Sequence, residues 1–281
     1  MNLLKEEKLY GLIGYPVRHS LSAVMHNTAF RRLRINAEYK LFEVRPDNLG
    51  FFLRSAREKN IFGLNVTVPY KEKVIPFLNK VSSEARLIGA VNTIKCQQKN
   101  LLGFNTDAEG FLKHLREDLR FDPKAKSVAV IGAGGAARAV IVSLCRFAPQ
   151  RVNIFDIDGL KLDVLIAHLK KNFRKIEFNP AASINELSIK KVDLLVNATP
   201  VGMKVSEPSL VDKKFLKKGL LVYDLIYNPK ETNLLRIARQ RGCRTANGLG
   251  MLLYQGMLSF EIWTGRKAPE GLMRKALEDA L

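Results

Sequence analysis

The sequence is poor in cysteine and histidine and has no long apolar run. Its 281 residues include three cysteines and four histidines. Cys96, Cys145 and Cys243 are widely scattered, so they fit neither a disulfide framework nor a metal-binding spacing, and the histidines form no ligand-like cluster. No apolar stretch reaches membrane-spanning length, and the acidic start of the chain does not resemble a signal peptide. We therefore expect a cytoplasmic protein without a metal site or a membrane contact.

Acidic residues are also few. The chain has 27 Asp and Glu against 46 Lys and Arg, a formal net charge of +19 at pH 7. Such an excess can indicate a nucleic-acid-binding surface. However, the basic pairs, such as Lys170-Lys171 and Lys217-Lys218, are spread along the chain, and no basic arm or basic–aromatic stripe occurs. The balance favours a solvated surface that attracts anionic small molecules, and we expect no nucleic-acid partner.

The most informative segment covers residues 128–137, where a buried strand is followed by a glycine-rich turn and the start of a helix. The spacing fits G-x-G-x-x-G/A. Gly132 permits the tight turn, Gly134 lets the backbone approach a pyrophosphate, and Ala137 permits close packing of helix on strand. The free amides at the helix start are then placed to hold phosphates. By itself the pattern is weak, because glycine turns between strand and helix are common.

The next strand strengthens this interpretation. After a helix through Leu144, residues 152–155 read as a strand that ends at Asp156. This acid follows the glycine turn by about 20 residues, where a dinucleotide-binding unit places the group that holds the ribose. The order of strand, glycine turn, helix, strand and acid predicts a mononucleotide-binding unit, so a hydride-carrying cofactor is the first functional hypothesis.

Strands and helices alternate along the rest of the chain, without internal repeats. This alternation predicts parallel sheets covered by helices, in two α/β units before and after about residue 107. A helix over 250–260 follows the second sheet and is free to return to the first unit, with a ligand bound in the cleft between the two. The expected strands cover 9–13, 38–44, 63–66, 90–95, 101–103, 193–197 and 221–224, and the expected helices cover 23–33, 48–59 and a stretch from 70 onward.

Polar side chains follow the strands of the first unit. Ser20 and Ser22 come after the first strand, and two hydroxyls separated by one residue can both donate to a single carboxylate. As an alternative, Ser22 only caps the following helix. Asn65 and Thr67 lie on one face of the third strand because side chains alternate along a strand.

A cation, an amide and a carboxylate complete this set. Pro69 ends the third strand, so that Lys71 opens a helix. Asn92 lies within the segment 89–93, and Asp107 ends the segment Asn105-Thr106-Asp107. Taken alone, Lys71 is an ordinary surface residue and Asp107 a helix cap. Together at sheet edges, these groups suit a polyhydroxylated, anionic substrate.

The order of these motifs resembles that of the shikimate dehydrogenases, over nearly the whole chain. Each motif alone is weak, whereas the set is highly specific. The motifs are Ser20-x-Ser22, Asn65-Val66-Thr67-Val68-Pro69-Tyr70-Lys71, Gly89-Ala90-Val91-Asn92-Thr93, Asn105-Thr106-Asp107, Gly132-Ala133-Gly134-Gly135-Ala136, Asn197-Ala198-Thr199-Pro200, Tyr223-Asp224-Leu225-Ile226-Tyr227 and Asn247-Gly248-Leu249-Gly250-Met251, ending at Gln255.

This resemblance implies an enzyme of chorismate and aromatic amino acid biosynthesis that interconverts 3-dehydroshikimate and shikimate with NAD or NADP. It implies Lys71 and Asp107 as the catalytic pair, with Lys71 stabilising charge on the ketone oxygen and Asp107 keeping Lys71 charged and oriented. Which of the two is the formal proton donor stays open. The implied substrate-binding residues are Ser20, Ser22, Asn65, Thr67, Asn92, Tyr227 and Gln255. The implied cofactor-binding residues are Gly132, Ala133, Gly134, Gly135, Ala136, Asp156, Asp158, Lys161, Thr199, Leu225 and Gly248.

The resemblance also implies two domains. The first is a substrate-binding and catalytic domain over 1–106, completed by the C-terminal helices over 248–281. The second is a Rossmann-type, doubly wound dinucleotide-binding domain over 107–247. A monomer and a homodimer both fit the sequence.

Four positions depart from the family pattern. Ala23 replaces the Pro that usually ends the serine motif, Phe104 replaces a polar residue, and Asn247 replaces an Asp. We expect these three changes to be tolerated. In the fourth, the basic clamp that grips the 2′-phosphate of NADP is replaced by Asp156-Ile157-Asp158, with only Lys161 at a basic position. A carboxylate there accepts bonds from free ribose hydroxyls and repels a phosphate, so we expect NAD to be preferred over NADP.

Two alternatives remain. The acidic segment is similar to that of NAD-using quinate/shikimate dehydrogenases of the catabolic branch. Ser22 favours shikimate, because quinate-active relatives often carry Thr there. The other alternative is a non-catalytic dinucleotide-binding regulator, which has no need of Lys71 and Asp107.

Overall fold

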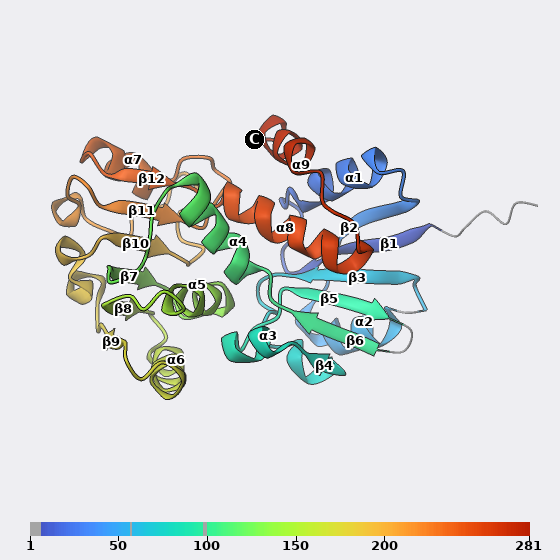
Figure 1. The fold of residues 1–281 in the computed structure, drawn as a ribbon, viewed down its shortest axis with the longest axis horizontal. Coiled ribbons are helices and arrows are strands. Elements are labelled where there is room, and N and C mark those ends of the chain that lie inside the picture. The colour runs from blue at the N-terminus through green and yellow to red at the C-terminus, as the bar shows by residue number, and fades with distance from the viewer. Residues whose placement is uncertain (1–6, 57, 98–99) are drawn as a thin grey trace, which may run out of the picture. The chain divides into compact units, whose positions relative to one another are not determined.

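A computed structural model describes residues 7–56, 58–97 and 100–281. The protein divides into two compact units. The first consists of the chain up to Gly110 together with Leu252–Ala280, and the second of Phe111–Met251 with Leu281 (Figure 1). Within the described residues, no helix is both long and apolar enough to cross a membrane.

The first unit is built on a six-stranded mixed sheet. Its strands are β1 Lys8–Gly14, β2 Ala37–Glu43, β3 Ile61–Val66, β4 Lys80–Val81, β5 Thr93–Gln97 and β6 Asn100–Phe104. They are ordered β2-β1-β3-β5-β6-β4, and β5 pairs antiparallel with both β3 and β6. The prediction of a parallel sheet is therefore confirmed for the pairings of β1 with β2 and β3 and of β4 with β6, and it is wrong for β5. The link between β5 and β6 is too short for a crossover helix, so the two strands form a hairpin.

Short helices belong to this unit as well. They are α1 Ser22–Arg32, α2 Leu49–Ser55, α3 Ser83–Ile88 and α9 Glu270–Asp279, with 3₁₀ turns at Pro46–Asn48 and Ile75–Phe77. The helix expected from residue 70 is wrong. Lys71 lies in a turn, and Pro76, which lacks the amide proton a helix interior needs, falls within the 3₁₀ turn. Helix α3 was not predicted from the sequence. It begins after Ser82, whose hydroxyl accepts from the Ala85 amide at 3.2 Å.

Two helices continue from one unit into the other. α4 covers Asp107–Lys113 and is followed by a π-helical turn over His114–Asp118, and α8 covers Leu249–Thr264. The part of α8 in the first unit packs on its sheet. A Cβ on Gly63 would lie 2.4 Å from the indole nitrogen of Trp263, and that indole donates to the Ile94 carbonyl at 2.9 Å. The chain thus returns to the first unit within α8.

The second unit is a doubly wound parallel sheet, as predicted. Its strands are β7 Ser127–Ile131, β8 Arg151–Phe155, β9 Glu177–Pro180, β10 Leu194–Asn197, β11 Leu221–Asp224 and β12 Arg244–Ala246. They are ordered β12-β11-β10-β7-β8-β9, and every pairing is parallel. The helices are α5 Gly135–Cys145, α6 Gly159–Asn172 and α7 Asn233–Gln240, with 3₁₀ turns at Ile184–Leu187, Ile189–Lys191 and Lys213–Phe215.

The burial of the central strands explains why the second unit could be predicted from the sequence. Every residue of β7, β10 and β11 is buried, and these strands are apolar except for one polar residue at an end of each. Such strands are typical of a parallel sheet covered by helices on both faces. The edge strands β9 and β12 were not predicted, because they are short and carry exposed polar residues.

Candidate functional site

The first unit brings Lys71 and Asp107 into a direct ion pair. Lys71 Nζ lies 2.5 Å from Asp107 Oδ2, and the side chains are only 14% and 6% exposed. Asp107 is the first residue of α4, yet it does not cap the helix. The Asn105 side chain does so, since its Oδ1 accepts from the amides of Asp107 at 3.0 Å and Ala108 at 3.3 Å. The Asp107 carboxylate is therefore left to bind Lys71.

Asn92 holds this carboxylate from the other side. Its Oδ1 accepts from the Thr106 amide at 2.7 Å, and because a backbone N–H can only donate, this contact fixes the orientation of the side-chain amide. Its Nδ2 consequently faces Asp107 Oδ1 at 2.9 Å. The Val91 amide also donates to the Lys71 carbonyl at 2.7 Å, which ties both catalytic segments to one loop.

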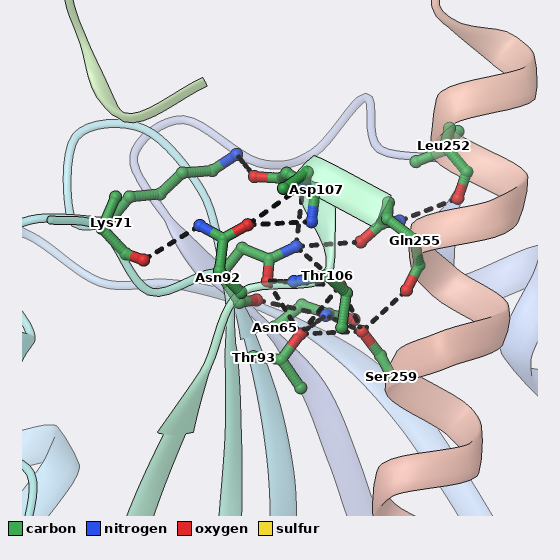
Figure 2. A network of polar contacts seen from close by, with 12 residues as sticks. Asn65, Lys71, Asn92, Thr93, Thr106, Asp107, Leu252, Gln255 and Ser259 are labelled. Atoms are coloured by element: carbon green, nitrogen blue, oxygen red, sulfur yellow. Dashed lines mark hydrogen bonds and ion pairs between the residues drawn. The ribbon is translucent and has the colours of Figure 1, made fainter. Parts of the chain in front are cut away.

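A buried polar network supports Asn92 (Figure 2). The Ser259 hydroxyl on α8 donates to the Gln255 carbonyl at 2.9 Å and lies 2.8 Å from the Thr93 hydroxyl and 3.1 Å from that of Thr106. Asn65 Nδ2 donates to Ser259 at 2.9 Å. These side chains are nearly inaccessible to solvent, so each donor depends on a protein acceptor.

The predicted substrate residues Asn65, Asn92 and Gln255 lie in this network. Gln255 Oε1 accepts from Asn92 Nδ2 at 3.3 Å, while its Nε2 donates to the Leu252 carbonyl at 2.8 Å. Asn65 Oδ1 accepts from the Tyr39 hydroxyl at 2.8 Å. The structure thus places three of the predicted residues around the Lys71 pair.

The two serines are also neighbours. Ser20 Oγ donates to Ser22 Oγ at 3.2 Å, and the Ser22 amide lies 3.3 Å from Ser20 Oγ. Ser22 is the first residue of α1 and the capping position is Leu21, which provides no side-chain bond. The alternative that Ser22 only caps the helix is therefore wrong.

Thr67 directly follows β3. Its amide donates to the Ile13 carbonyl at 2.9 Å, which joins the ends of β1 and β3. A Cβ on Gly14 would lie 2.4 Å from the Thr67 methyl group, so glycine is required at position 14 for this approach. Thr67 thereby lies at the same sheet edge as the turn that carries Lys71.

The glycine-rich turn in the second unit has the conformation that its sequence predicts. Gly132 has φ +116°, a region that favours glycine, and a Cβ there would lie 3.0 Å from the Ala198 carbonyl oxygen. Gly134 precedes α5, and a Cβ built on it meets no atom of the described residues within 4 Å. The turn therefore leaves open space in front of the first amides of α5, as phosphate binding requires.

The acids after β8 are both engaged. Asp156 accepts from the amides of Ala133 at 2.6 Å and Asp158 at 2.8 Å, so it holds the glycine-rich turn as well as lying at the strand end. Asp158 caps α6 by accepting from the Lys161 amide at 3.1 Å. The Lys161 side chain, 2.8 Å from Asp158, lowers the pKa of this carboxyl. Ile157 between them is 95% exposed.

The remaining cofactor residues, Thr199, Leu225 and Gly248, follow three neighbouring strands, β10, β11 and β12. Thr199 Oγ1 donates to Asn197 Oδ1 at 2.7 Å, and the Leu225 amide donates to the Asn197 carbonyl at 2.9 Å. A Cβ on Gly248 would lie 1.9 Å from the Leu225 carbonyl oxygen, so no other residue fits there. Tyr227 belongs to the second unit, whereas the other six predicted substrate residues belong to the first.

Three buried polar side chains near these residues were not predicted as site residues from the sequence. Ser259 and Tyr39 complete the network behind Asn92, and Asp224 is fully buried at the end of β11. A lone serine within the apolar segment of α8 was the available signal for Ser259. For metal binding, the described ranges contain no group of three or more His, Cys, Asp or Glu side chains able to hold an ion.

Two family models match the chain, one within each of the two segments that make up most of the first unit. The one described as the shikimate dehydrogenase substrate binding domain matches residues 12–94. The one described as the shikimate 5'-dehydrogenase C-terminal domain matches residues 248–278.

Relatives and solved structures match over the full length. A shikimate dehydrogenase (NADP(+)) of Methanopyrus kandleri is 43% identical over 98% of this chain and 97% of its own. The structure of shikimate 5-dehydrogenase from Listeria monocytogenes with shikimate and NAD has a TM-score of 0.86 at 34% identity, covering 99% and 98% of the two chains. That of quinate dehydrogenase from Corynebacterium glutamicum with NAD has a TM-score of 0.87 at 31% identity, covering 97% and 99%.

Proposed function

The chain belongs to the shikimate dehydrogenase family, and from this premise we propose how its residues perform the reversible oxidation of shikimate to 3-dehydroshikimate. The observation that carries the proposal is the buried constellation of Lys71, Asp107 and Asn92. A binding protein has no use for a partly dehydrated ammonium group held 2.5 Å from a carboxylate.

The pair suits the proton-transfer half of this reaction. The nicotinamide dinucleotide supplies or accepts the hydride. In the reductive direction, the ketone carbon gains the hydride and its oxygen gains negative charge. Lys71 Nζ stabilises that charge and gives the oxygen a proton, and in the oxidative direction it takes the hydroxyl proton back. Asp107 keeps the ammonium group in place and accepts from a neighbouring substrate hydroxyl.

The polar residues around the pair suit the rest of the substrate. We assign the substrate carboxylate to the adjacent hydroxyls of Ser20 and Ser22. We assign the ring hydroxyls to Thr67, Asn92 and Gln255. Tyr227 keeps the substrate-binding role that membership of the family implies. Asn65 already bonds to Tyr39 and Ser259, so we assign it mainly to the orientation of this group.

The second unit carries the dinucleotide in this proposal. The residues of the glycine-rich turn, Gly132, Ala133, Gly134, Gly135 and Ala136, face the pyrophosphate, which the open space at the start of α5 accommodates. Asp156 faces the ribose, and Thr199, Leu225 and Gly248 border the nicotinamide. The substrate domain accordingly covers 1–106 with 248–281, and the dinucleotide domain covers 107–247.

We further propose that NAD is preferred over NADP. Ile157 presents an exposed apolar side chain where a phosphate clamp needs a cation, and the ammonium group of Lys161 is already paired with Asp158. Both features remove positive charge from the position of the 2′-phosphate.

Initial rates of shikimate oxidation with NAD and NADP in parallel test both proposals. Turnover with NAD at a higher kcat/KM supports them together. Turnover with NADP alone retains the activity and overturns the cofactor assignment. Quinate serves as the comparison substrate, because faster turnover of quinate than of shikimate would contradict the assigned substrate.

A further inference from the structure

Asp224 is a buried carboxylate that the proposed chemistry does not use. It ends β11, and its side chain is completely inaccessible to solvent. Oδ1 accepts from Asn197 Nδ2 at 3.0 Å and from the Ile226 amide at 3.1 Å, and Oδ2 accepts from the Thr232 hydroxyl at 2.7 Å. One carboxylate thus joins the ends of two neighbouring strands to the start of α7.

The partners of Asp224 reach the residues assigned to the dinucleotide. Asn197 Oδ1 accepts from the Thr199 amide at 3.1 Å and from its hydroxyl at 2.7 Å. The Leu225 amide donates to the Asn197 carbonyl at 2.9 Å, and the Ile226 carbonyl accepts from the Gly248 amide at 3.0 Å. Thr199, Leu225 and Gly248 are therefore all one or two hydrogen bonds away from a single side chain.

The burial of this charge is unfavourable for stability. Desolvation raises the pKa of Asp224 to about 6, against the opposing effect of its three donors, so the ionised form is disfavoured in the folded protein. A neutral side chain of the same shape would be less costly to bury. The carboxylate is instead the group that can accept from three donors on three segments at once.

We propose that Asp224 is a positioning residue, whose carboxylate fixes the loops that carry Thr199 and Leu225 and thereby preorganises the dinucleotide site. This inference rests on the proposed function and deepens it. Asp224 touches neither substrate nor dinucleotide in this account. It acts through Asn197 and through the backbone of Leu225 and Ile226.

The decisive readout is the dissociation constant for NADH and NADPH, measured by their fluorescence without any turnover. Asp224→Ala leaves the donors of Asn197, Ile226 and Thr232 without an acceptor, and it is expected to weaken binding at least about tenfold and to lower kcat about 100-fold. Asn197→Ala cuts the same link while retaining the carboxylate. It is expected to weaken dinucleotide binding and lower kcat to the same extent. If Asp224→Ala does not fold, Asn197→Ala alone tests the positioning role of Asp224.

Asp224→Asn separates positioning from stability. The asparagine oxygen keeps the bonds from Asn197 and Ile226, and its amide can donate to the Thr232 hydroxyl, which has lone pairs to accept it. Its dissociation constant should stay within about threefold of wild type, while it unfolds at a higher urea concentration near pH 7 because no charge is buried. A merely structural role predicts instead that affinity follows stability across the variants.

Asp193→Ala is the matched control. Asp193 accepts from the Ser127 amide at 2.9 Å, at the amino-terminal ends of β7 and β10. Because Asp224 lies at the carboxyl-terminal end of β11, the loss of Asp193 should lower stability without changing dinucleotide affinity. Wild-type affinity in folded Asp224→Ala and Asn197→Ala, or an Asp224→Asn variant as impaired as Asp224→Ala, would overturn the inference. Wild-type binding of a dinucleotide without turnover of shikimate overturns only the assigned substrate. A wild-type protein that binds neither NADH nor NADPH overturns both.

Discussion

Lys71 Nζ lies 2.5 Å from one oxygen of Asp107, whose other oxygen accepts from Asn92 at 2.9 Å. The carboxylate is thus held on both sides, and the lysine is held by the carboxylate. Little water reaches the pair, so its charges are less screened than on the surface. An ammonium group that needs no reorganisation is well suited to stabilise a developing oxyanion.

Replacement of Lys71 by Met is expected to lower kcat for shikimate oxidation about 1000-fold, because it removes both the proton acceptor and the cation at the reacting oxygen. The KM for the dinucleotide should change little. Steady-state rates from the absorbance of the reduced dinucleotide measure both. Lys95→Met is the matched control, since Lys95 lies in the same unit and its ammonium donates to the Ile262 carbonyl at 2.8 Å. Near wild-type turnover in folded Lys71→Met contradicts the assignment.

Replacement of Ser22 by Ala is expected to raise the KM for shikimate about tenfold with little change in kcat, because one charge-assisted hydrogen bond to the substrate carboxylate is lost. Stability should change little, since Ser22 does not cap α1. Ser55→Ala serves as the control, a buried serine that donates to the Phe52 carbonyl at 3.2 Å. An unchanged KM in Ser22→Ala would show that the carboxylate binds elsewhere.

The second unit was predicted more completely than the first. Its central strands are apolar runs separated by helices, and local sequence is sufficient to read such an alternation. In the first unit, β5 and β6 form a hairpin within an otherwise parallel arrangement, and Pro76 lies where a helix was expected. The hairpin depends on the length of the connection between two strands, and the absence of the helix depends on a single proline. Hydrophobic periodicity reports neither of these.

The candidate site divides in the same way. Lys71 and Asp107 could be predicted because each comes after a strand of the first unit, and polar groups there mark binding edges. Asn92 directly precedes β5 and was predicted from its motif. Ser259 could not, since it lies 194 residues from its partner Asn65 and only the packing of α8 brings them together. Asp224 belongs to the motif over 223–227, but its hydrogen bond to Thr232 is apparent only in the folded structure.

A double substitution, Ile157→Arg with Asp158→Ser, is expected to shift the ratio of kcat/KM for NADP over NAD at least about 100-fold toward NADP. The arginine adds a cation at the 2′-phosphate position and the serine removes a repelling carboxylate. Serine also retains the capping of α6, which Asp158 now provides to the Lys161 amide.

Asp212→Ser is the control for this cofactor switch. Asp212 caps the 3₁₀ turn at Lys213–Phe215 in the same unit by accepting from the Lys214 amide at 2.9 Å. It should leave the NADP to NAD ratio unchanged. A double variant that folds, turns over NAD and gains nothing with NADP would place the 2′-phosphate away from this loop.

His26 is buried, and neither of its ring nitrogens has a hydrogen-bond partner among the described residues. Its ring stacks on Tyr39 with ring centroids 4.5 Å apart. Burial lowers its pKa from 6.5 to about 3. The unfolded chain therefore binds a proton between these pH values that the folded chain does not, so stability falls as the pH drops. From about pH 6 to about pH 4, His26 should cost about 1.4 kcal/mol of unfolding free energy per pH unit.

His26→Phe removes this proton uptake while retaining a planar ring against Tyr39. Urea unfolding followed by the fluorescence of the single tryptophan, Trp263, measures the free energy in the right unit, because its ring lies 5.3 Å from that of His26. We expect the slope of free energy against pH to decrease in His26→Phe by about 1.4 kcal/mol per unit. It should remain at the wild-type value in His19→Gln, where the histidine is exposed. Since only slopes are compared, any packing cost of the larger ring cancels, and equal slopes in wild type and His26→Phe would mean that His26 is protonated in the folded protein.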